Sequence, residues 1–119
     1  MRTFNLLSCS TITGEDVRND TGEDLGKIED IMIDVDTGRI AYAVLSFGGF
    51  LGIGDKYFAI PWESLRVSMD GNEFILDVPK EKLENAPGFD KDNWPTSPDR
   101  EFVSNIYSYY GYRPYWDVE

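Results

Sequence analysis

The sequence predicts a mainly β domain, a small closed sheet followed by a C-terminal helix and an aromatic tail. Three observations support this prediction. Short apolar runs alternate with glycine-containing polar turns between residues 22 and 78, as in small all-β domains. The length of 119 residues fits a single hydrophobic core. Residues 89–119 differ in composition, because they hold nine of the 17 aromatic residues.

The clearest strands lie on either side of a turn at Asp36-Thr37-Gly38. In the first strand, Ile31 and the alternating residues after it share one face, whereas Ile28 falls on the other. We therefore expect a β-bulge near residues 29–30. Gly38 suits the positive φ of a hairpin turn. The return strand, 40–47, is apolar on both faces, so it should be central and covered on both sides.

Further strands follow at shorter intervals. Residues 57–60 form a short strand that ends at Pro61. Alternating apolar residues at 65–69 and 74–78 flank an Asp70-Gly71 turn and predict a second hairpin. A weaker strand candidate lies around residues 12–18.

Two helices are expected after the strands. Pro79 begins a short helix over 79–85, and a second helix starts at 97–99 and ends at Gly111. We accordingly divide the chain into an N-terminal extension (1–9), a barrel domain (10–88) and an aromatic-rich C-terminal helix and tail (89–119).

Charge and composition restrict the partners. The net charge of −11 disfavours nucleic acid and anionic lipid, so partners should be basic, apolar or cationic. The longest uncharged stretch, 40–54, contains four glycines and is shorter than the roughly 20 residues of a membrane span, so we expect no membrane insertion. With Cys9 as the single cysteine and no export signal in residues 1–10, the simplest expectation is a cytoplasmic protein.

The residue content argues against an enzyme. The chain has no histidine, which excludes serine–histidine and cysteine–histidine catalysis and histidine metal sites. Asp34 and Asp36 could bind a hard cation, but carboxylates beside a hairpin turn more often serve turn hydrogen bonds. An EF-hand fails because position twelve of the loop is Leu45. We therefore expect no catalytic residue, no metal ligand and no cofactor.

A P-loop interpretation of the glycine-rich segment 48–56 also fails, because Asp55 stands where lysine belongs. This segment is either a flexible strand connection or a contact loop with apolar residues that face a partner. The aromatic tail could stack on bases, but its acidic character favours packing on the barrel or on another subunit. The candidate interaction residues are Phe47, Phe50, Leu51, Ile53, Tyr109, Tyr110, Tyr112, Tyr115 and Trp116.

Three segments occur in register with those of a known family: Gly26-Lys27-Ile28-Glu29-Asp30, residues 34–40 and Ala59-Ile60-Pro61-Trp62. Over roughly residues 10–88 the chain resembles the PRC-barrel family. The tail, with Trp94-Pro95 and residues 109–112, is similar to that of stand-alone bacterial members. The resemblance implies a highly bent, six-stranded antiparallel β-barrel that is used for protein–protein contact and carries no catalytic residue.

The sequence is compatible with two functions. The first is a non-enzymatic, cytoplasmic interaction or assembly module, which we expect to be a homodimer that covers its apolar excess by self-association. The second is a regulator that binds a small ligand or a cation through the acidic turns, Glu29-Asp30 and Asp34 to Asp36, or through the aromatic tail.

Overall fold

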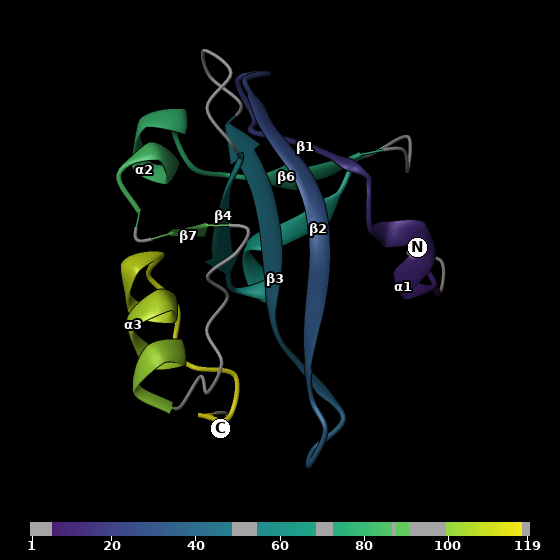
Figure 1. Ribbon diagram of the computed structural model, residues 1–119, viewed down its shortest axis with the longest axis vertical. Coiled ribbons are helices and arrows are strands. Elements are labelled where there is room, and N and C mark those ends of the chain that lie inside the picture. The colour runs from purple at the N-terminus through teal and green to yellow at the C-terminus, as the bar shows by residue number, and fades with distance from the viewer. Residues whose placement is uncertain (1–5, 49–54, 69–72, 87, 91–99, 118–119) are drawn as a thin grey trace, which may run out of the picture.

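The computed structural model describes residues 6–48, 55–68, 73–86, 88–90 and 100–117. It is mainly β, with one strongly curved sheet and a C-terminal helix beside it, which confirms the predicted fold class (Figure 1). The elements in chain order are α1 (Cys9–Ile12), β1 (Asp16–Arg18), β2 (Asp24–Asp34), β3 (Arg39–Gly48), β4 (Asp55–Ile60), the 3-10 turn η2 (Trp62–Ser64), β5 (Leu65–Val67), β6 (Phe74–Leu76), α2 (Lys80–Glu84), β7 (Phe89–Asp90) and α3 (Arg100–Tyr109).

The described strands lie in the order β5-β6-β1-β2-β3-β4-β7. All neighbours are antiparallel except β1 and β6, which pair in parallel through Val17 with Phe74 and Arg18 with Ile75. The sheet is therefore mixed, and the expectation of a purely antiparallel sheet is corrected. The reason is the path of the chain, because the β5–β6 hairpin returns to the far edge of β1 after β4. A two-residue strand, β7, is added at the other edge and was not predicted.

The β2–β3 hairpin is the longest feature of the sheet, and its end, here named the arm (residues 32–41), projects beyond the other strands (Figure 1). The register shifts between Ile28 and Asp30, which confirms the predicted bulge. Gly38 has a φ of 78° in the turn, as expected for a hairpin glycine. The arm thus follows from local sequence signals.

Strand β3 is covered on both faces, as its apolar sequence predicted. It lies between β2 and β4, and residues 41–45 are all buried. Helix α3 covers it from outside: the rings of Tyr42 and Phe102 meet edge to face at 5.9 Å. The hydroxyl of Tyr107 donates a hydrogen bond to the carbonyl of Ala41 at 2.6 Å. These contacts position the C-terminal segment over the arm.

Most of the remaining predicted elements have counterparts. Of the strand candidate at 12–18, only residues 16–18 form a strand, because Ile12 ends α1, and the predicted helix start at 97–99 lies outside the described residues. Strands β5 and β6 pair from Leu65 with Leu76 to Val67 with Phe74, although the turn between them lies outside the described residues. Helix α2 begins directly after Pro79, and α3 ends before Gly111, whose φ is 84°. No helix in the described ranges is long and apolar enough to cross a lipid bilayer.

Candidate functional site

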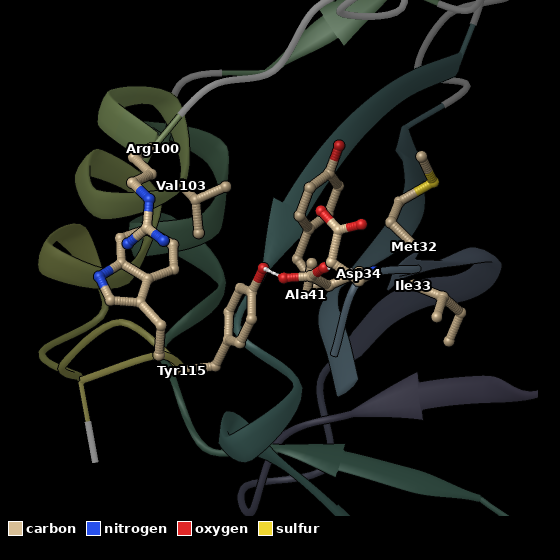
Figure 2. Close-up of a pocket in the computed structure, with 10 residues that line it drawn as sticks. Met32, Ile33, Asp34, Ala41, Arg100, Val103 and Tyr115 are labelled. Atoms are coloured by element: carbon tan, nitrogen blue, oxygen red, sulfur yellow. Dashed lines mark hydrogen bonds between the residues drawn. The ribbon is translucent and has the colours of Figure 1, made fainter. Parts of the chain in front are cut away.

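A pocket of about 370 Å³ lies where the arm meets α3 and the chain that follows it (Figure 2). We name it the arm–tail pocket. The arm contributes one wall. Helix α3 and the residues after it, here named the tail (110–117), contribute the other. The lining residues are Met32, Ile33, Asp34, Asp36, Ala41, Tyr42, Arg100, Val103, Tyr115 and Trp116.

A hydrogen bond holds the tail against the arm. The hydroxyl of Tyr115 donates to Oδ2 of Asp34 at 2.5 Å (Figure 2). The other carboxylate oxygen, Oδ1, accepts the backbone N–H of Asp36 at 3.0 Å, so Asp34 also organises the turn. The interpretation of Asp34 as a turn residue is confirmed, and its second role in holding the tail was not visible in the sequence.

The contact between tail and arm changes the acidity of both groups. The hydrogen bond from Tyr115 lowers the pKa of Asp34, because a donor stabilises the charged carboxylate. Burial, helped by the adjacent carboxylate, raises the pKa of Tyr115 to about 12. At neutral pH the pair is therefore a neutral phenol that donates to an ionised carboxylate.

Two arginines lie over the aromatic rings of the tail. The guanidinium of Arg100 lies 4.6 Å from the centre of the Trp116 ring, and that of Arg39 lies 6.0 Å from the Tyr115 ring. The two rings meet edge to face at 5.1 Å. The two distances from guanidinium to ring are within cation–π range. This aromatic surface therefore already holds cations of its own chain.

The structure distributes the predicted interaction residues over several places. Tyr115, which is buried, and Trp116, which is half-buried, both line the pocket. Phe47 is buried against Phe58, with ring centres 6.2 Å apart. Tyr112 is 41% exposed. Phe50, Leu51 and Ile53 lie outside the described residues.

Tyr109 is the last residue of α3 and Tyr110 follows it directly, and neither lines the pocket. The half-buried Tyr109 donates a hydrogen bond to the carbonyl of Lys82 at 2.7 Å, which ties α3 to α2. Tyr110 is buried, and its hydroxyl has no hydrogen-bond partner in the described part of the chain. These aromatic residues pack against their own domain.

The two acidic turns that the sequence singled out lie in different places relative to the pocket. Asp34 and Asp36 both line the pocket, whereas Glu29 and Asp30 are exposed and do not. No group of three or more His, Cys, Asp or Glu side chains that could hold a metal ion occurs among the residues described here.

Sequence reasoning missed the arm as a surface. Ile33 is 43% exposed and Val35 is 87% exposed, whereas the alternation predicted only that they share one face of a strand. A usable signal was the position of Val35 between two aspartates next to a turn, where no neighbouring strand can cover it. Arg100 was also missed, because only the tertiary contact with Trp116 brings it to the pocket.

Comparison with known proteins agrees with the architecture. The family model for the PRC-barrel domain matches residues 4–83, about two thirds of the chain. A search of curated proteins gives no match. Since the matched segment contains β1 to β6 and the long β2–β3 hairpin, the chain belongs to the PRC-barrel family.

Proposed function

We propose that this protein is a non-enzymatic module that binds another protein through the arm and the tail, and that it acts in the cytoplasm. The arm–tail pocket together with the exposed apolar residues of the arm carries the proposal. Ile33 lines the pocket and Val35 lies in the same arm, and both are exposed. Apolar and aromatic residues around a few polar groups are typical of the centre of a protein interface.

Self-association is the simplest form of this function, and we propose a homodimer. Exposed β-branched residues on a projecting hairpin offer apolar surface that a second copy would cover. The net charge of −11 opposes association at low ionic strength, because like charges repel. Dimer formation should therefore strengthen as salt rises.

Sedimentation velocity over a concentration series tests the dimer, with Val35→Ser as the interface variant and Leu6→Ser as the control. Leu6 is 78% exposed and lies in the N-terminal segment. We expect the wild type and the control to dimerise and Val35→Ser to remain monomeric. A wild type that stays monomeric throughout would exclude the homodimer.

Binding to a different protein is tested by affinity capture with the same three proteins. A partner that is retained by the wild type and Leu6→Ser but lost by Val35→Ser should then bind the purified wild type directly. Equal capture by all three would remove the arm from the interaction. The absence of both saturable capture and self-association would refute the proposed function.

One observation favours the alternative, a regulator that binds a cation or a small ligand. The arm–tail pocket joins the acidic turn at Asp34 and Asp36 to the aromatic tail, the two features that the sequence offered separately. If calcium is the ligand, it should raise the melting temperature of the wild type but not of Asp34→Asn with Asp36→Asn. An equal effect of calcium on both proteins would exclude this site.

A further inference from the structure

The arm–tail pocket has the size and the mixed lining of a binding site. Its volume of about 370 Å³ lies within the range of small-molecule sites, roughly 300–1,000 Å³. Met32, Ala41 and Val103 provide apolar surface, and the charged groups approach from two sides (Figure 2). A ligand that combines a short apolar stem with a charged end would fit this lining.

The arm side of the pocket is anionic. Asp34 uses both carboxylate oxygens in hydrogen bonds, to the Tyr115 hydroxyl and to the N–H of Asp36. The carboxylate of Asp36 makes no hydrogen bond or ion pair within the described residues and is exposed at the pocket. The pocket thus holds two negative charges, and that of Asp36 is available to a ligand.

The tail side of the pocket is aromatic and attracts cations. Arg100 lies over the face of Trp116 at 4.6 Å, and Arg100 is itself an exposed residue. Within the described residues, the ring face is its one contact of this kind, and an exposed arginine held in that way is readily displaced, since such contacts are worth about 0.5–1 kcal/mol. Arg100 therefore occupies the place that the cation of a partner would take.

The charge of the whole chain favours the same ligand. With 22 acidic against 11 basic residues, the surrounding potential is negative and draws cations toward the pocket. An anion would meet Asp34 and Asp36 in addition to this background. Among the charged residues that line the pocket, only Arg100 would attract it, and Arg39 lies nearby against the ring of Tyr115.

We propose that the arm–tail pocket receives a lysine or arginine side chain of a basic protein partner. The alkyl stem packs on Met32, Ala41 and Val103. The charged end pairs with Asp36 and lies over Trp116, from which Arg100 is displaced. This inference rests on the proposed function in the form of binding to a different protein, because it names the chemistry of that partner.

The probes for the test are n-butylammonium and n-butylguanidinium chloride, which reproduce the ends of lysine and arginine side chains. n-Butanol and sodium butyrate are the uncharged and anionic controls. The full chain, labelled with ¹⁵N, is titrated at low salt while the amide signals and the Trp116 indole N–H are followed. We expect saturable shifts at Asp36, Tyr115 and Trp116 at millimolar concentrations of the cations alone, as befits ligands of this size.

Three variants test whether each side chain strengthens or weakens the binding of the cations. Asp36→Asn should weaken binding of both cations about fivefold, because it removes the available carboxylate. Arg100→Ala should strengthen binding by a similar factor, because it removes a competing cation. Glu29→Gln, which changes the net charge as Asp36→Asn does but lies outside the pocket, should have less than a twofold effect.

Each contrary outcome overturns the inference in a recognisable way. Butyrate binding that is lost in Arg100→Ala would make the pocket an anion site. Equal effects of Asp36→Asn and Glu29→Gln on the affinity would show that the cations are attracted only by the net charge of the protein. No cation shifts would reject the pocket, yet a partner captured through Val35 would leave the interaction module intact. Cation binding without a protein partner would instead refute the proposed function.

Discussion

Gly26 determines how closely β2 approaches β3. Its φ is 102°, in the region that favours glycine, and a Cβ atom there would overlap the backbone carbonyl of Ser46. Two independent requirements, backbone conformation and space, thus meet at one residue. In the sequence, Gly26 was visible only as the first residue of a segment shared with the family, without the physical reason for a glycine there.

We predict that Gly26→Ala lowers the free energy of unfolding by about 2–5 kcal/mol, the sum of a left-handed backbone and a displaced strand. Gly22→Ala is the matched control, because Gly22 also has a positive φ but has open space around it. The control should lose only about 1–2 kcal/mol. Urea denaturation measures both, and equal losses would show that the approach of Ser46 has no energetic role.

At the scale of elements, the contact between Tyr115 and Asp34 couples the tail to pH. The hydrogen bond lowers the pKa of Asp34 in the folded protein below the unfolded value of about 3.9. A lowered pKa contributes stability that is present above the unfolded pKa and is lost as the pH falls through the folded pKa. The tail should therefore loosen from the arm in acid.

We predict that Tyr115→Phe raises the pKa of Asp34 toward its ordinary value, as measured by NMR titration of the carboxyl carbon. The stability difference between wild type and variant should be present near neutral pH and shrink as the pH falls below about 4. Tyr112→Phe is the control, because Tyr112 is exposed and lies outside the pocket. An unchanged pKa in Tyr115→Phe would contradict the hydrogen bond.

Helix α3 belongs to the core and is not an appendage of the sheet. Val103, Ile106 and Tyr107 are buried, and Tyr107 bonds to the backbone of β3. We predict that Ile106→Ala costs about 2–4 kcal/mol of unfolding free energy, because a buried side chain leaves a cavity. Asn105→Ala, on the exposed side of the same helix, should change it by less than about 0.5 kcal/mol. Similar small losses in both variants would mean that α3 is only loosely attached.

At the scale of the whole molecule, the net charge of −11 acts against compactness as well as against association. We predict that raising sodium chloride from about 20 mM to 500 mM raises the melting temperature, because the Debye length falls below typical charge separations. Repeating the measurement at a low, fixed protein concentration separates folding from dimer formation. A melting temperature that falls with salt would show that attractive pairs outweigh the repulsion.

Much of the sheet could be predicted because its signals are local. Alternation, the turn at Gly38 and the bulge near residue 29 are properties of neighbouring residues in the chain, and each has its counterpart in the structure. The parallel pairing of β1 with β6 could not be predicted, since it joins Val17 to Phe74, which β2 to β5 separate along the chain, and so depends on the path of the chain.

The candidate site, like the sheet, was predictable from the sequence only where local features are concerned. The sequence supplied its parts, the aspartates of the turn and the aromatic tail, because composition and spacing are visible without coordinates. Only the tertiary structure decided that Tyr115 bonds to Asp34, 81 residues away, and that Arg100 lies over Trp116. The sequence by itself determined a PRC-type sheet with an acidic hairpin turn, since hydrogen bonding and burial within a strand follow from nearby residues. The pocket was decided by the packing of α3 on β3, because contacts between distant segments depend on the complete path of the chain.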